Sequence, residues 1–117
     1  MSSLAIQATI NDTTTALNKV ANLSVTTTGN QFDFRRVEVT TAEYTFTIST
    51  DVGDCGYCWI RNTDATNYVE VGFATTVYYL KLLAGQVALF PLVAAQSALY
   101  LKANTATCEV EVYVHEA

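Results

Sequence analysis

The stretch "WIRNTDATNYVEVGF", residues 59–73, joins two apolar-rich segments through a cluster of small polar residues at 62–67. Apolar residues alternate with polar ones on both sides of the cluster, which is the period-two pattern of strands with one buried face. Asn and Asp are common in turns because their side chains hydrogen-bond to nearby backbone amides. The stretch therefore predicts two strands joined by a hairpin turn at 62–67, with four side chains facing the core: Ile60, Val69, Val71 and Phe73.

The same alternation continues along most of the chain, in short runs separated by turn residues. Runs of this kind are "FDFRRVEVTT" (32–41), "EYTFTIST" (43–50), "YCWIRN" (57–62), "TVYYLKL" (76–82), "QVALF" (86–90), "ALYLKA" (98–103) and "CEVEVYVHE" (108–116). About eight to ten short strands, spaced roughly 8–12 residues apart, are typical of a sandwich or barrel. We therefore expect an all-β fold, a single antiparallel β-sandwich over residues 31–117, with a jelly-roll as one candidate topology. The segment 92–101 is the best candidate for a short helical turn.

Residues 1–30 contain the least core-forming material. Leu4, Ile6 and Ile10 share one face of an alternating N-terminal segment, and a Thr- and Asn-rich stretch follows. We expect this region to be an extended arm or edge strand that orders against a neighbouring molecule. Leu4, Ile6 and Ile10 are therefore candidate interaction residues.

Composition limits the partners that this chain can have. The 117 residues fit one domain, and they carry a formal net charge of −5 with only 15% charged residues. Nucleic acid binding needs clustered positive charge, and Arg35-Arg36 is the only adjacent basic pair. Eighteen Thr replace much of the missing charge. A neutral, Thr-rich surface suits β-strands and contacts with copies of the same chain.

The chain also contains an uncharged stretch, residues 82–101, that is long enough to cross a bilayer. Gly85, Gln86 and Pro91 interrupt it at intervals that suit strand ends, so we expect no membrane span. The first residues, "MSSLAIQATIND", lack the basic start and apolar core of a secretory signal. Three cysteines are too few for a disulfide scaffold and fit assembly in reducing cytoplasm.

Cys55-Gly56-Tyr57-Cys58 is the one motif typical of metal or redox chemistry. A zinc site needs two further ligands, and Cys108 and His115 differ in strand parity, so they project to opposite faces. A redox pair would open a helix in a βαβ unit, which the sequence does not contain. We therefore expect Cys58 and Cys108 to be small buried hydrophobes and Cys55 to lie in the preceding turn.

Other polar residues have simpler interpretations than catalysis. His115 is the only histidine, and on a terminal strand we expect it at the surface. Asp51 with Asp54, or Asp64 with its neighbouring asparagines, offer too few carboxylates for calcium, so turn chemistry is the better interpretation. The sequence therefore predicts no catalytic residue, no metal site and no cofactor, in a protein that is not an enzyme.

Aromatic residues are numerous for so small a chain. Parity places Tyr57, Trp59 and Arg61 opposite Cys58 and Ile60, so one of these two sets faces outward. Exposed, Tyr57, Trp59 and Tyr68 could stack on sugars or anchor a protein interface. Tyr57, Trp59, Arg61 and Tyr68 are therefore candidate interaction residues.

Three segments of the chain resemble small virion structural proteins of tailed bacteriophages. They are "IRNTDATNYVEVGF" (60–73), "YYLKLLAGQVALFPL" (78–92) and "ALYLKANTATCEVEVYVHEA" (98–117). The shared pattern is N-x-D-x-x-N between strands, then a turn of the form L-x-P-G-E, then a terminal V-x-V strand. The turn here, residues 82–86, departs from that form at Ala84 and Gln86.

The resemblance implies a β-sandwich, with a jelly-roll as one candidate, that binds other capsid or tail subunits and has no cofactor. From it we expect a capsid decoration (cement) protein in a virion assembled in the host cytoplasm, with a minor neck or tail component as the near variant. Its partners would be the major capsid protein and copies of itself, a trimer among the candidates. A carbohydrate-binding module is the alternative of a different class.

Overall fold

The computed structural model describes all residues, 1–117, and divides the chain into two compact units, Met1–Asn30 and Gln31–Ala117. The first unit is a two-stranded antiparallel hairpin of β1 (Ser2–Asp12) and β2 (Leu17–Thr27). The Asp12 carboxylate closes its turn by accepting hydrogen bonds from the Thr14 amide and the Thr15 hydroxyl. The N-terminal segment is thus a regular hairpin, although residues 17–27 alternate only weakly.

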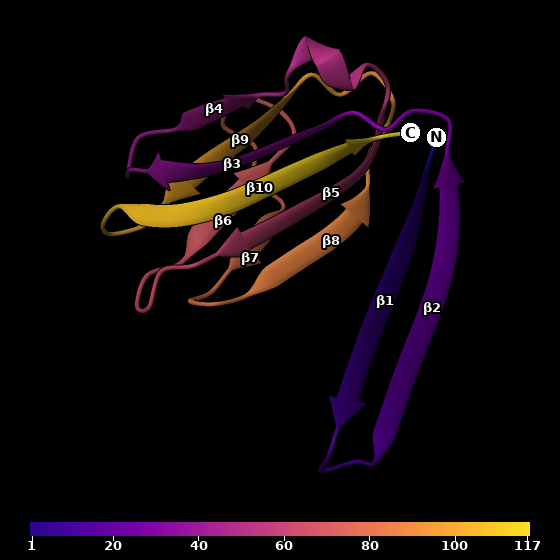
Figure 1. Cartoon of the computed structure of the whole chain (residues 1–117). Coiled ribbons are helices and arrows are strands. Elements are labelled where there is room, and N and C mark those ends of the chain that lie inside the picture. The colour runs from indigo at the N-terminus through magenta and orange to yellow at the C-terminus, as the bar shows by residue number, and fades with distance from the viewer. The chain divides into compact units, whose positions relative to one another are not determined.

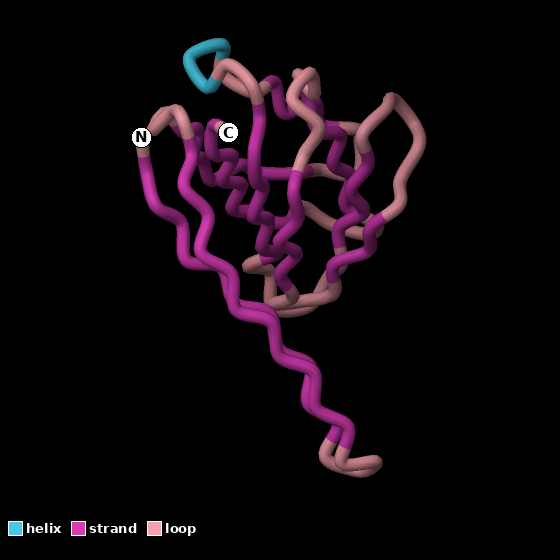
Figure 2. Tube along the Cα trace, turned by 90° about the vertical axis from the view of Figure 1, so that its right-hand side faces the viewer, coloured by secondary structure: helices cyan, strands magenta, loops and turns pink.

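The second unit contains eight strands and one 3-10 turn. The strands are β3 (Phe32–Val39), β4 (Tyr44–Thr47), β5 (Cys55–Asn62), β6 (Val69–Gly72), β7 (Leu80–Leu82), β8 (Val87–Pro91), β9 (Ala98–Ala103) and β10 (Cys108–Glu116). The 3-10 turn η1 (Thr50–Val52) is the only helical segment, shown in cyan in Figure 2. Residues 92–97 form a connection without the helical turn that the sequence suggested there.

The eight strands form two antiparallel sheets, β3-β10-β5-β8 and β4-β9-β6-β7 (Figure 1). Each early strand pairs with a late one in nested order: β3 with β10, β4 with β9, β5 with β8 and β6 with β7. Eight strands nested in this way over two packed sheets are a jelly-roll. The predicted antiparallel β-sandwich is confirmed.

The core lies between the two sheets and is built from the inward residues of each alternating strand. In β10, Cys108, Val110, Val112 and Val114 share one face of the strand and are all fully buried. From the other sheet, Phe46 of β4 and Leu99 and Leu101 of β9 are also fully buried. Burial of these side chains stabilises the sandwich by about 1.5–3 kcal/mol for each large one.

The hairpin turn predicted at 62–67 is wrong. β5 pairs with β10 and β8, whereas β6 pairs with β9 and β7, so the segment between β5 and β6 crosses from one sheet to the other. Ile60, Val69 and Val71 do face the core and are fully buried, and Phe73 is partly buried against it. Both sheets present their apolar faces to the same core, so alternation alone cannot distinguish a hairpin from such a crossing.

Asn62 fixes the path of this crossing. Its side chain is fully buried, and its amide nitrogen donates to the carbonyl oxygens of Asn67, Leu82 and Leu83 at 2.8, 3.1 and 3.3 Å. Its amide oxygen accepts from the Asp64 backbone amide at 3.0 Å. One side chain thus ties the end of β5 to the crossing segment and to the end of β7 in the other sheet.

The rest of the crossing is held by Asp64. Its carboxylate accepts the backbone amides of Asn67 and Thr66 at 2.6 and 2.9 Å. These two hydrogen bonds, that from Asn67 first, lower the pKa of Asp64. The Asn62-x-Asp64 pair therefore satisfies the backbone polar groups of a segment that belongs to neither sheet.

A second polar link joins the sheets at the β3 edge. The buried Asp33 carboxylate forms a two-pronged ion pair with Arg35, with both N···O distances 2.9 Å, and accepts the Ser49 amide at 2.9 Å. Arg35 also donates to the Thr47 carbonyl, and its guanidinium carbon lies 3.9 Å from the centre of the Phe46 ring. Because Thr47 and Ser49 lie at and just after the end of β4, this network fastens β3 to the opposite sheet.

We predict that Asn62→Ala destabilises the sandwich by about 3 kcal/mol, because it removes the donor to three carbonyls and leaves buried groups unpaired. Urea unfolding followed by the fluorescence of Trp59, the only tryptophan, measures this change. The matched control is Asn67→Ala, which keeps the backbone carbonyl that Asn62 binds and should change stability by less than about 0.5 kcal/mol. Equal losses in both variants would contradict the role assigned to Asn62.

Candidate interaction surface

The outward face of the β3-β10-β5-β8 sheet gathers aromatic side chains from strands that are far apart in sequence. The strand registers align Phe34, Tyr113, Trp59 and Leu89 in one row across the sheet, and Phe32, His115, Tyr57 and Pro91 in the next. Residues directly opposite each other on paired strands point to the same side of a sheet. We call the surface formed by these eight residues the aromatic face.

The rings of the aromatic face pack around Tyr113. Its ring centre lies 5.8 Å from that of Phe32, 6.3 Å from that of Phe34 and 6.1 Å from that of His115. These separations are within the range of favourable aromatic pairs, so the contacts hold the rings in place before any partner arrives. Partial burial raises the pKa of the Tyr113 hydroxyl.

Much of this apolar surface stays open. Phe32 is 58% exposed, Phe34 46% and Leu89 41%, while Tyr57, Trp59 and Tyr113 are half-buried. Large aromatic rings exposed together, rather than singly, are the usual mark of a binding surface. The aromatic face can bury these rings against a flat apolar or aromatic partner.

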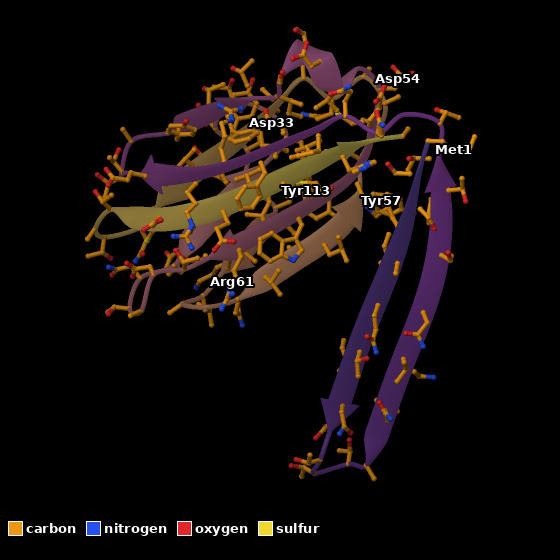
Figure 3. The ribbon with its side chains drawn as sticks, viewed as in Figure 1. Met1, Asp33, Asp54, Tyr57, Arg61 and Tyr113 are labelled. Atoms are coloured by element: carbon orange, nitrogen blue, oxygen red, sulfur yellow. The ribbon has the colours of Figure 1, made fainter.

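A charged row borders the aromatic face. The next register row aligns Arg36, Glu111, Arg61 and Val87. Arg36 forms ion pairs with Glu109 at 3.1 Å and Glu111 at 2.9 Å, but Arg61 is exposed and has no ion pair within the chain. An arginine beside exposed rings suits a partner's carboxylate or aromatic ring. Figure 3 shows Tyr57, Arg61 and Tyr113 along β5 and β10.

The structure unites only some of the candidate residues chosen from sequence. Tyr57, Trp59 and Arg61 lie on one side of β5, opposite the buried Cys58 and Ile60, as their parity predicted. Tyr68 precedes β6 in the other sheet, where its ring lies 4.2 Å from the Lys81 ammonium. Leu4, Ile6 and Ile10 belong to the hairpin unit.

Sequence reasoning missed Phe32, Phe34, Tyr113 and Leu89 as members of this surface. The alternation at Phe32 and Phe34 was a usable signal, because two aromatics two residues apart share a face. Their assignment to the same surface as Trp59 needed the pairing of β3 and β5 with β10, which no single strand encodes.

His115 corrects a prediction. It was expected at the surface, yet it is only 3% exposed. It lies between Phe32 on β3 and Tyr57 on β5, so an aromatic ring flanks it on each side. Its Nδ1 lies 2.6 Å from the Glu116 carbonyl oxygen.

Cys55 corrects another prediction, because it is the first residue of β5 and lies in the core, rather than in the preceding turn. Tyr57 pairs with His115 and Cys55 with Glu116, so Gly56 is an extra residue, a β-bulge. The bulge lets Cys55 and Cys58 both face inward although they are three residues apart. A Cβ at Gly56 would lie 2.9 Å from the Ala117 Cα, so the bulge position requires glycine.

The three thiols occupy apolar surroundings without a metal-binding cluster. No group of three or more His, Cys, Asp or Glu side chains is placed to hold a metal ion. The Cys55 thiol donates to the Gln96 carbonyl at 3.2 Å. Burial raises the pKa of Cys58 to about 12 and also raises those of Cys55 and Cys108. Separately, no helix of the structure has the length and hydropathy to cross a bilayer.

Fold and surface together define the class of this protein: a jelly-roll β-sandwich with an exposed aromatic face on one sheet. Comparisons with models of protein families, with curated proteins and with solved structures give no match. A function for this chain is therefore a proposal, built on its own residues and on the resemblance of its sequence motifs.

We predict that all three cysteines of the native protein resist a thiol-specific disulfide reagent at mildly alkaline pH. The raised pKa values leave little thiolate, and the side chains are at most 3% exposed. Unfolding in guanidinium should release three reactive thiols, which serves as the control. Rapid titration of Cys55 and Cys58 in the native protein, or stoichiometric zinc in its native mass spectrum, would show that the C-x-x-C is a functional site.

Proposed function

We propose that this chain is a non-enzymatic structural protein of a tailed-phage virion, a capsid decoration protein that binds and stabilises capsid subunits. The observation that carries the proposal is the aromatic face, an ordered apolar surface bordered by the charged row of Arg36, Glu111 and Arg61. Aromatic side chains and arginine are the residues that most often dominate protein interfaces. The resemblance of residues 60–117 to small virion proteins supplies the class of partner.

The mechanism of such a protein is adhesion. Trp59, Tyr57 and Phe34 would bury their rings against a capsid subunit, and Arg61 would meet a carboxylate or ring at the margin. Each contact need not be tight, because many copies bound to one shell reinforce one another through multivalency. The low charge of the chain reduces repulsion between neighbouring copies. A minor neck or tail component would use the same surface at a different position in the virion.

The test measures the protein in purified particles by quantitative mass spectrometry. We expect a copy number that matches capsid symmetry, and we expect Trp59→Ala to reduce occupancy at least tenfold, the loss of about 1.4 kcal/mol or more that is typical of a central aromatic. Tyr100→Ala is the matched control, because Tyr100 is a half-buried aromatic on β9 of the other sheet and should leave occupancy unchanged. Protein found only free in the lysate would overturn the proposal.

A carbohydrate-binding module is the second candidate, and the same surface favours it. Tyr57, Trp59 and Tyr113 lie together on one sheet face, and aromatic rings on a sheet can stack on sugar rings. Jelly-rolls also occur among lectin domains, although fold alone decides nothing.

This candidate makes its own prediction, because Trp59 is the only tryptophan and lies in the face concerned. A bound glycan should change Trp59 fluorescence with saturation, and Tyr113→Ala should weaken that binding, whereas Tyr100→Ala should not. Unchanged fluorescence across a broad glycan panel would exclude the module and leave the virion role.

A further inference from the structure

The hairpin unit carries an apolar face that nothing within the unit covers. The register pairs Leu4 with Val25, Ile6 with Leu23 and Ala8 with Ala21, and it places Ile10 and Leu17 on the same side. The opposite side carries mostly small or polar residues, as in the pairs of Gln7 with Asn22 and Asn11 with Asn18, and Val20 is its one large apolar residue. We call the surface of Leu4, Ile6, Ala8, Ile10, Leu17, Ala21, Leu23 and Val25 the hairpin apolar face.

This face requires a partner on energetic grounds. A two-stranded hairpin alone is at best marginally stable in water, and it gains independent stability only when an apolar face packs on something. Near the turn the exposure is large: Ile10 is 73% exposed, Leu17 55% and Leu23 52%. Eleven paired residues in each strand are far more than a marginal hairpin sustains without such packing.

Two charges at the turn end of this face indicate what the partner is. Asp12 and Lys19 lie on the same side of the hairpin as the hairpin apolar face, on opposite strands, where Asp12 pairs with Leu17 and Lys19 with Ile10. Hydrogen bonds from Thr15 and Thr14 lower the pKa of Asp12 and fix its carboxylate, while Lys19 forms no ion pair within the chain. The turn end of this side therefore carries one acidic and one basic side chain, and it is complementary in charge to the same end of another copy.

Rotational symmetry between copies gives an arrangement in which these charges are complementary. When copies of a hairpin are related by an axis along the hairpin, β1 of one copy lies against β2 of the next, with the turns at the same end. The apolar pairs of the two copies then meet at the same height. Asp12 of one copy faces Leu17 of the other and lies about 7 Å along the strand from that copy's Lys19, a distance that the long lysine side chain can span. An antiparallel arrangement would instead bring the charged turn end against Leu4 and Val25, at an uncompensated desolvation cost.

The area of the face suits a contact among three copies better than one between two. Eleven residues at about 3.4 Å each and two strands about 4.8 Å apart give a footprint of roughly 370 Å² per copy. Two copies therefore cover roughly 740 Å², the size of a typical crystal-packing contact, whereas three cover roughly 1,100 Å², just above the roughly 1,000 Å² that a specific interface usually needs. The contact is small, so it suits a protein whose copies are also held by a shared surface.

We propose that the hairpin unit is a self-association element through which copies of this chain bury their hairpin apolar faces together, with their turns at the same end. The proposal adds self-association to the structural role proposed above. It rests on that role in one respect only, that binding to a shared surface brings the copies together. Its partner is another copy of the same chain, in a dimer or trimer.

The first test is the mass of purified full-length protein by light scattering over a range of concentrations. Wild type should reach the mass of two or three chains, and the double variant Ile6→Asp/Leu23→Asp should stay monomeric. The matched control is Gln7→Asp/Asn22→Asp, the adjacent cross-strand pair on the opposite side with the same added charge. Unchanged thermal unfolding of the sandwich, followed by Trp59 fluorescence, would show that any loss of mass is not a loss of folding.

The second test distinguishes the two arrangements. Ile10→Cys and Leu4→Cys proteins are mixed in equal amounts and treated with a bis-maleimide of about 10 Å reach, the spacing of packed sheets. The parallel arrangement predicts crosslinks between two copies of the same variant, since the two substituted positions would lie about 20 Å apart along the strands. The antiparallel arrangement predicts crosslinks between one Ile10→Cys chain and one Leu4→Cys chain. The native thiols are buried and should not contribute.

The outcomes decide the proposal. Association that only the Ile6→Asp/Leu23→Asp variant abolishes, with crosslinks mainly between copies of the same cysteine variant, supports it. A monomeric wild type, equal loss in both double variants, or crosslinks mainly between the two different cysteine variants would overturn it. Because these experiments use purified protein, they can fail while the protein is still found in particles, and they can succeed while it is absent from them.

Discussion

The jelly-roll depends on one buried side-chain amide. Asn62 ends β5, and its amide nitrogen reaches carbonyl oxygens of the crossing segment and of the β7 end in the opposite sheet. A crossing between sheets leaves backbone groups without ladder partners, and burying such groups unpaired costs about 1–3 kcal/mol each. The side chains of Asn62 and Asp64 form hydrogen bonds with these backbone groups and so avoid that cost. As a result, β5 and β6 can belong to different sheets. The nested pairing of the remaining strands requires this separation.

The crossing has a direct consequence for the surface. Because β5 leaves its sheet at Asn62, both of its edges are free to pair, with β10 on one side and β8 on the other. Trp59 and Tyr57 therefore lie in the interior of an outward face rather than at its margin, between Tyr113 and Leu89 or His115 and Pro91. Had residues 62–67 formed a hairpin, β6 would have occupied one of these edges and the aromatic face would not have formed. The polar crossing and the aromatic surface are thus two results of one strand order.

Sequence alone predicted those features of the fold that are determined within a single strand. Alternation predicted most strands, the inward set of Ile60, Val69 and Val71, and the placement of Tyr57, Trp59 and Arg61 on the side of β5 opposite Cys58 and Ile60. Alternation failed where a feature depends on which strands are paired with each other. The crossing at 62–67 looked like a hairpin because both sheets bury the same parity, and Cys55 was misplaced because the Gly56 bulge is defined by its partner strand. His115 was misplaced because Phe32 and Tyr57 flank it only once β10 lies between β3 and β5.

The two units bear on assembly in different ways. In the sandwich the aromatic face lies outside a fully buried core that is built from other residues. The hairpin has no such core, and its apolar residues are the only source of its packing energy. If the hairpin associates as we propose, concentrating the copies on a surface would strengthen that association, because it then becomes effectively intramolecular. Binding through the sandwich would therefore promote contacts through the hairpin, and the two weak interactions would reinforce each other.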